Sequence, residues 1–190
     1  MASAQSIAVD VHFGFARWSE YYHPNQATDE HELFEDYGIG ARLTWRPSPV
    51  FGIDGDTTWY PQGPGDQKLP GHRFEVLLGA TVGPRMDRFR PFAKASLGFV
   101  KLAQHPDAVL CDQPVPPYLT CLLEAGRTLP AYDIGGGFEF APSGQQFIRV
   151  DASTRILKYP GPAYARDGQL KVASFWGAGL RLAAGYGFQF

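Results

Sequence analysis

Apolar and polar side chains alternate along the last part of the chain, residues 172–190. The even positions are mostly apolar and include Trp176, Leu180 and Tyr186, whereas the odd positions are mainly small or polar, as at Arg181. Successive side chains of a strand point to opposite faces, so a strand of this sequence has one apolar face. A helix would spread its glycines and Arg181 around the cylinder and would have no apolar stripe. The segment is therefore predicted to be a long strand.

Seven earlier segments alternate in the same way, and each is predicted to be a strand: 6–18, 33–45, 50–60, 72–82, 89–102, 129–140 and 146–157. The connections between the eight strands also alternate in length. Long ones cover 19–32, 61–70, 103–128 and 158–171, and short ones cover 46–49, 83–88 and 141–145. An even number of strands with short turns at one end and long loops at the other is typical of a transmembrane barrel. We therefore predict an all-β fold, an eight-stranded antiparallel up-and-down transmembrane β-barrel that forms a single domain over residues 1–190.

Aromatic residues gather at both ends of the predicted strands. One group lies beside the short turns or at the C-terminus: Trp45, Phe51, Phe89, Phe140, Phe147 and Phe190. The other lies beside the long loops: Tyr37, Trp59, Phe74, Phe99, Tyr132, Tyr159 and Trp176. Such girdles mark the two interfaces of a membrane barrel.

Composition narrows the setting further. The 190 residues carry a net charge of −2, with 44% hydrophobic residues and no run of about 20 apolar residues. The charge offers no basic surface for nucleic acid, so we expect no such partner. The first residues, MASAQSIAVD, lack the basic and apolar regions of a signal peptide. We therefore expect the mature form of an exported protein, behind an added or retained Met1, and we expect no cofactor.

The pattern over essentially the whole chain resembles the small eight-stranded bacterial outer-membrane barrels of the OmpA and OmpX type. The resemblance is carried by stretches such as GIGARLTWRPSPVFGIDGDTTWYP and RFRPFAKASLGFV, and the strand ending on Phe190 resembles the assembly signal of such barrels. It implies an outer-membrane location with membrane lipid as a partner, and long extracellular loops, around Asn25, Gly65, Gln113 and Ala165, that are free to bind a protein or surface ligand. We expect no peptidoglycan-binding domain after the barrel, so the anchoring role of larger members is not expected here.

Charged residues occupy the polar face of the strands, which points into the predicted barrel: Asp10, Asp36, Arg42, Asp54, Asp56, Arg73, Glu75, Lys94, Asp133, Glu139, Arg149, Asp151, Arg155 and Arg181. An eight-stranded interior is just wide enough for side chains to fill. Ions persist there only when they are paired and hydrogen-bonded. We expect pairs between adjacent strands, Arg42 with Asp54 and Arg149 with Glu139, and a lumen closed by this charge network.

Two other interpretations of the barrel remain open. A soluble lipocalin-like barrel also has alternating strands, but its apolar face points inward around a ligand and gives the aromatic girdles no purpose. A lipid-modifying membrane enzyme needs a nucleophile and a base within hydrogen-bond reach. Ser174 faces outward far from His72, and Ser153 shares the lumen with His12 among charged residues. We therefore expect no catalytic residues and favour a structural or interaction role through the loops.

Three local features have chemical interpretations. Asp54 and Asp56 could form part of a calcium loop, and 29–32 with His23 could bind a metal, but ion pairing and a solvated loop are the expected arrangements. The sequence thus predicts no metal site. Cys111 and Cys121 are the only cysteines and share the predicted loop 103–128, so we expect a disulfide between them in an oxidising exterior.

Overall fold

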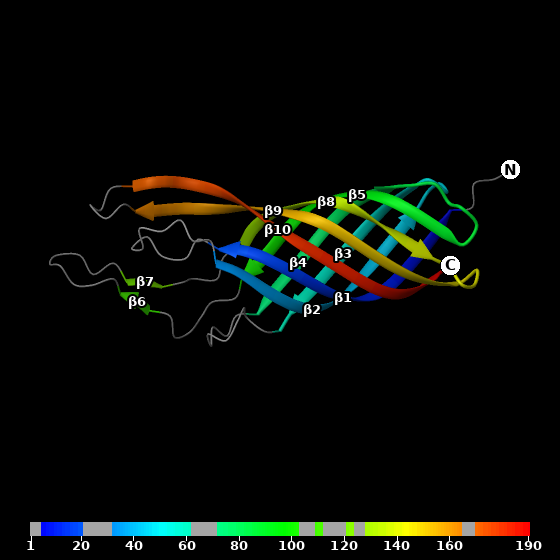
Figure 1. The fold of residues 1–190 in the computed structure, drawn as a ribbon, viewed down its shortest axis with the longest axis horizontal. Helices are drawn as coiled ribbons and strands as arrows, with labels where there is room; N and C mark the ends of the chain where they lie inside the picture. Colours follow the sequence, from blue (N-terminus) through cyan, green and yellow to red (C-terminus); the bar gives the residue numbers. More distant parts are fainter. Residues whose placement is uncertain are drawn as a thin grey trace.

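The computed structural model describes residues 5–20, 32–61, 72–102, 109–111, 121–123, 128–164 and 170–190. Eight of its strands form a closed antiparallel barrel in the order β1-β10-β9-β8-β5-β4-β3-β2 (Figure 1), which confirms the predicted fold class. Their bounds are β1 Ser6–Glu20, β2 Glu32–Arg46, β3 Phe51–Tyr60, β4 Arg73–Val82, β5 Phe89–Leu102, β8 Thr128–Phe140, β9 Gln146–Tyr164 and β10 Leu170–Gln189. None of the described residues belongs to a helix long and apolar enough to span a membrane.

The barrel closes because β1 pairs with both β2 and β10. Val11, for example, lies opposite Ala41 on one side and Tyr186 on the other. The chain ends come together there: the amide of Ile7 donates to the carbonyl of Phe190 at 3.1 Å, and the amide of Phe190 donates to the carbonyl of Ile7 at 2.8 Å. The start of β1 and the C-terminal Phe190 lie at the end of the barrel that carries the short turns (Figure 1), as the even strand number predicts.

The strands near the long connections differ from the prediction. The loop expected at 158–171 is largely strand, since β9 runs to Tyr164 and β10 begins at Leu170. The expected loop 103–128 contains a separate hairpin of β6 Val109–Cys111 and β7 Cys121–Leu123. Alternation identifies strands that separate two environments. Two strands that pair only with each other need no such alternation, so the sequence pattern does not predict the small hairpin or the extensions of β9 and β10.

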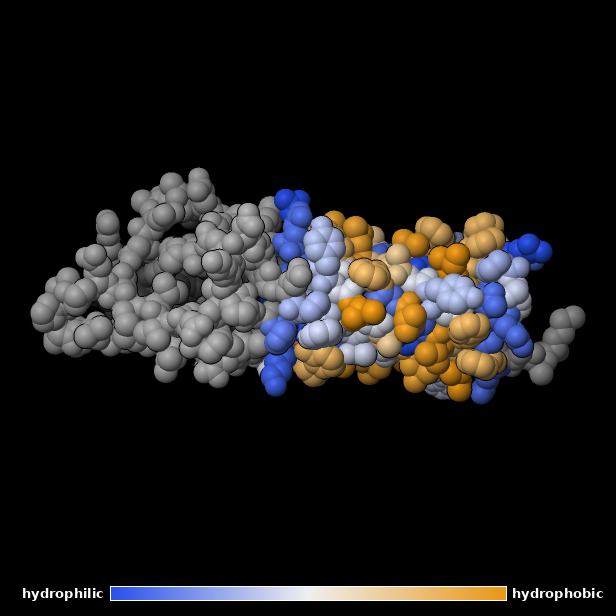
Figure 2. All heavy atoms as spheres, turned by 90° about the horizontal axis from the view of Figure 1, so that it is seen from below, coloured by the Kyte–Doolittle hydropathy of each residue, from blue (hydrophilic) through white to orange (hydrophobic). Residues whose placement is uncertain are grey.

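Apolar side chains cover the outside of the barrel, whereas charged ones fill the inside. Phe13, Leu97 and Ile134 are 68%, 61% and 62% exposed, whereas Arg149 and Arg181 are 1% and 0% exposed. Figure 2 shows hydrophobic residues spread over one face of the barrel, with hydrophilic residues at its ends. A lipocalin-like barrel has the opposite arrangement, so the structure excludes that alternative.

Ring contacts connect strands at both ends of the apolar surface, between the neighbours β5 and β8 at one end and across β9, from β8 to β10, at the other. The rings of Phe89 and Phe140 lie 4.8 Å apart beside the short turns, and those of Tyr132 and Trp176 lie 6.0 Å apart near the other end. Phe147 was wrongly assigned to the outer girdle. It is 3% exposed and points inward, because it has the parity of the lumen-facing residues of β9.

Candidate functional site

The charged lumen is the main candidate site. All fourteen predicted charges are buried there, and the structure adds Arg46 and Arg90. The charged side chains buried in the described residues are then eight acids and eight bases, with His12 beside them: Asp10, Asp36, Asp54, Asp56, Glu75, Asp133, Glu139, Asp151, Arg42, Arg46, Arg73, Arg90, Lys94, Arg149, Arg155 and Arg181. Equal numbers of opposite charges allow every ion to lie near a counter-ion in this narrow interior.

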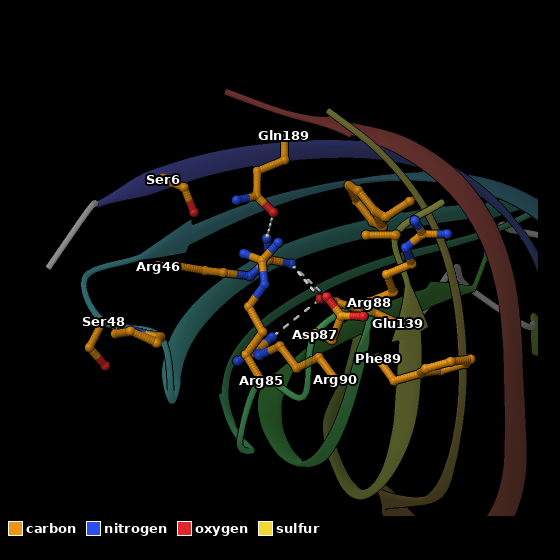
Figure 3. Close-up of a pocket in the computed structure, with 13 residues that line it drawn as sticks. Ser6, Arg46, Ser48, Arg85, Asp87, Arg88, Phe89, Arg90, Glu139 and Gln189 are labelled. Carbon is orange, nitrogen blue, oxygen red and sulfur yellow. Dashed lines mark hydrogen bonds and ion pairs between the residues drawn. The ribbon is translucent and has the colours of Figure 1, made fainter. Parts of the chain in front are cut away.

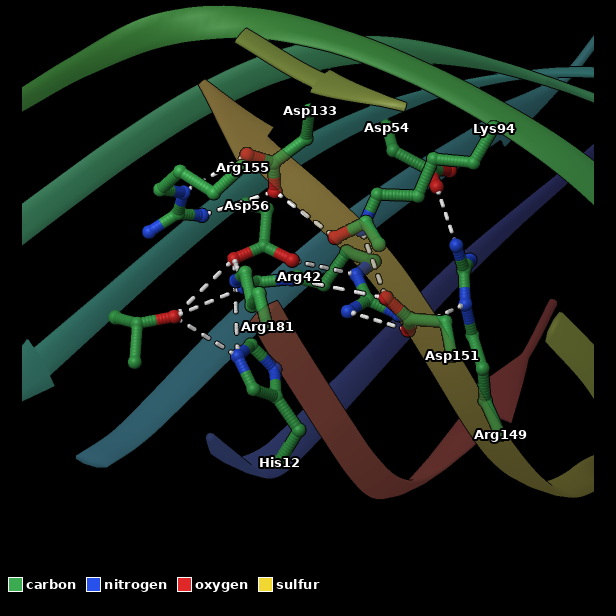
Figure 4. A network of polar contacts seen from close by, with 12 residues as sticks. His12, Arg42, Asp54, Asp56, Lys94, Asp133, Arg149, Asp151, Arg155 and Arg181 are labelled. Carbon is green, nitrogen blue, oxygen red and sulfur yellow. Dashed lines mark hydrogen bonds and ion pairs between the residues drawn. The ribbon is translucent and has the colours of Figure 1, made fainter. Parts of the chain in front are cut away.

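Arg181 of β10 lies at the centre of the network (Figure 4). Its guanidinium contacts carboxylates from two other strands, Asp56 on β3 at 2.9 Å and Glu75 on β4 at 2.9 Å. Asp151 on the neighbouring β9 lies 3.6 Å away. The planar guanidinium can bridge several carboxylates at once, which a lysine ammonium cannot do with the same geometry. One side chain therefore ties opposite walls of the barrel together.

Arg155 of β9 forms a second bridge. It donates to Asp133 of the adjacent β8 at 2.8 Å and also contacts Glu75 of β4 across the lumen. Ser153 donates a further hydrogen bond to Asp133 at 3.2 Å. Glu75 is thus shared by Arg155 and Arg181, so these two bridges form one connected group.

The predicted pair of Arg42 with Asp54 is wrong, whereas the pair of Arg149 with Glu139 is confirmed. The β2–β3 register places Asp56, not Asp54, opposite Arg42, and their side chains are 2.8 Å apart. Asp54 instead accepts from Arg149 at 2.6 Å across the lumen, while Arg149 contacts Glu139 at 3.3 Å. The alternation fixes which face a residue occupies, but only the register fixes its partner.

The remaining charges continue this pairing. Lys94 lies 2.8 Å from Asp151, and Arg73 lies 2.7 Å from Asp36. His12 lies 3.0 Å from the hydroxyl of Thr58. The ring of His12 fits only because residue 40 is glycine, since a Cβ there would collide with it.

An apolar cluster lies inside the barrel at the level of the Arg73–Asp36 pair, since Ala16 pairs with Asp36 and Tyr60 with Arg73 across neighbouring strands. It combines buried residues from six strands, most of them in the half of the strand far from the short turns: Ala16, Tyr60, Leu77, Val100, Leu129, Ala131 and Leu157. The cluster was not predicted, although several of its members have the lumen-facing parity.

The serine–histidine pair that was considered for the enzymatic alternative is not assembled in the described residues. Ser153 donates to Asp133, and His12 contacts Thr58, Asp10 and Asp56, so these two residues form no nucleophile–base pair. No three His, Cys, Asp or Glu side chains in the described ranges are grouped to hold a metal ion. The segment 29–31 with His23, and the side chain of Ser174, lie outside the described residues.

Comparisons with solved structures match this architecture. Neisserial surface protein A (NspA) is 13% identical, covers 97% of each chain and superposes with a TM-score of 0.60. Ail, the attachment invasion locus protein of Yersinia pestis, is 14% identical, covers 100% of each chain and has a TM-score of 0.52. The chain has the fold of the small eight-stranded outer-membrane β-barrels. No protein-family model and no curated protein matches this chain.

A disulfide in the small hairpin remains a prediction. The β6–β7 backbone register places Cys111 directly opposite Cys121, a pairing compatible with a cross-strand disulfide. A disulfide that closes this loop of about ten residues stabilises the folded protein by roughly 2–3 kcal/mol in the chain-entropy model. We expect labelling of the unreduced protein with a thiol reagent to modify neither cysteine. Labelling of both without prior reduction would disprove the bond.

Proposed function

We propose that the protein is a single-domain integral barrel of the bacterial outer membrane that holds surface loops and does not act as an enzyme or a pore. The observation that carries this proposal is the inverted distribution of side chains, apolar towards the surroundings and ionic inside. An apolar outer band contacts lipid favourably, so membrane lipid is the first partner. Every backbone donor and acceptor of a closed barrel finds a partner within it, as the hydrocarbon interior demands.

The interaction role is assigned to the long connections between strands. In membrane barrels of this kind the longer loops face the exterior, and loops supported by a rigid scaffold commonly carry binding residues. The name of the Yersinia pestis protein describes attachment, and that protein shares this fold. We propose that the present barrel likewise supports a protein- or surface-binding set of loops, at the end opposite the termini.

The proposed closed lumen predicts a protein that conducts poorly. Open aqueous channels require about 16 strands. Here, eight strands surround connected ion pairs and an apolar cluster. We expect planar-bilayer recordings of the purified monomer to show no large, steady conductance. Such a conductance would contradict the closed lumen while leaving the membrane location intact.

The proposed orientation predicts where a protease can cut. With the short turns in the periplasm, intact cells treated with an external protease should be cut within 103–128 and not within 46–49. Permeabilised cells provide the control, because the protease then reaches both sides. Cutting at 46–49 in intact cells, with 103–128 spared, would reverse the orientation.

A further inference from the structure

A pocket at the short-turn end of the barrel has an unusual set of charges. It has a volume of about 200 Å³ and lies between the ends of β1, β2, β5, β8, β9 and β10 and the turns beside them (Figure 3). Four arginines and two carboxylates line it: Arg46, Arg85, Arg88, Arg90, Asp87 and Glu139. The pocket is therefore positively charged, although the buried charges of the barrel as a whole balance.

The two buried arginines of this pocket, Arg46 and Arg90, donate hydrogen bonds to the same carboxylate, that of Glu139. Glu139 accepts from Arg46 at 2.7 and 2.8 Å and from Arg90 at only 3.5 Å, and it is also shared with Arg149. The Nε groups of Arg46 and Arg90 are buried and donate no hydrogen bond. Both residues are less than 6% exposed. A buried donor without an acceptor is costly, so the pocket has unused capacity to bind an anion.

The turns around the pocket hold it in a fixed shape. The amide of Ala141 donates to the carbonyl of Arg88 at 2.8 Å, and the amide of Gly83 donates to Val50 at 2.9 Å. A two-residue turn closed by Met86 and Phe89 carries Asp87 at a φ of 52°, a left-handed conformation that Asp tolerates. The turn leaves Arg85 and Arg88 exposed at the rim. A preformed site binds at a lower entropic cost.

We propose that this pocket binds a phosphate group, either free or as the phosphodiester of an acidic lipid headgroup. Guanidinium groups match phosphate oxygens in geometry and in charge. The apolar ring of Phe89, 55% exposed beside the pocket, lies on the surface that we assign to the membrane interface. The rim arginines thus stand where a headgroup of the adjacent leaflet would lie. This inference uses the membrane placement only for the lipid source, because free phosphate would bind in detergent as well.

The test compares two double variants of the full chain, folded in an uncharged glycoside detergent and phosphate-free buffer. In Arg85→Gln/Arg88→Gln, both rim charges are removed. In Lys101→Gln/Lys158→Gln, two exposed lysines near the other end are removed, which makes a matched control. We expect calorimetric titration with inorganic phosphate to show one site per chain. The rim variant should bind about tenfold more weakly, whereas the control should stay within about twofold.

Competition identifies the source of the phosphate. Short-chain phosphatidylglycerol should displace phosphate if the pocket accepts a headgroup, and a diacylglycerol of the same chain length should not. Displacement supports the lipid form, and phosphate binding without displacement supports the free anion. The inference is overturned if neither compound binds saturably, or if both double variants bind as tightly as the unmodified chain. Because folding is read separately from the shift of the unheated band on a gel, failure here would leave the proposed membrane barrel untouched.

Discussion

Replacing Arg181 with methionine should lower the free energy of unfolding of the barrel by about 3–5 kcal/mol. Arg181 is fully buried and contacts Asp56 and Glu75, each at 2.9 Å. Methionine fills part of the volume but leaves these carboxylates with less compensation in a narrow interior, and the loss of one partner from a buried ion pair is costly. Urea unfolding of both proteins in lipid vesicles, monitored by tryptophan fluorescence, measures the difference in the free energy of unfolding.

Arg17 provides the control for this substitution. Its side chain is 47% exposed and lies 3.9 Å from Glu35, so it forms a weak surface pair. Arg17→Met should change the free energy of unfolding by less than about 1 kcal/mol. Equal effects of the two substitutions would mean that the internal ion pairs add nothing beyond general surface charge, and the connected network would lose its structural role.

Replacing Leu78 with arginine should destabilise the barrel in a bilayer by about 2–4 kcal/mol. Leu78 lies in the middle of β4, is 59% exposed and faces outward between Gly55 and Leu97. If the barrel spans a bilayer, a guanidinium at the middle of β4 would have to enter the hydrocarbon, or the arginine side chain would have to bend towards an interface. The same substitution on the surface of a soluble barrel would meet water and cost little. Unfolding measured in vesicles therefore tests the membrane placement directly.

Val82 serves as the matched position, because it lies on the same face at the end of β4 and is 52% exposed. Val82→Arg should cost only about 0–1 kcal/mol, since a charge near the interface reaches water. The difference between the two positions is the informative quantity. If both substitutions cost the same, the apolar surface does not span a bilayer in the proposed way.

The sequence predicts the architecture because each barrel strand has an apolar face outside and an ionic face inside. That contrast forces strict alternation, so inward residues such as Asp133 and Arg155 are identifiable from parity alone. The same parity would have identified Arg90, which precedes Phe92 and Lys94 on the inner face of β5. Arg46 was assigned to a turn because Pro47 follows it, although its side chain continues the inner face of β2.

Pairing partners depend on information that parity does not contain. Arg149 contacts Asp54 from a strand on the opposite wall, and Arg46 contacts Glu139 in the same way. Such contacts depend on the stagger of the strands around the closed barrel, which no single strand encodes. Phe147 shows a second feature that the residue type and its position beside a turn do not determine. An aromatic residue next to a turn fits either an interface girdle or the lumen, and here the guanidinium of Arg46 lies 5.7 Å from its ring inside.

The junction of β1 with β10 has a consequence for how the protein reaches its folded state. These strands lie at opposite ends of the described chain, yet they pair from Ala8 with Gln189 to Arg17 with Leu180. Contacts between such distant segments form late in folding. The chain must first lose the entropy of closing a long loop before these contacts can stabilise it. Until they form, both edges would expose unpaired amides and carbonyls to hydrocarbon. We therefore expect an open sheet to be short-lived within a bilayer, so that insertion and closure proceed as one cooperative step whose rate depends on β10.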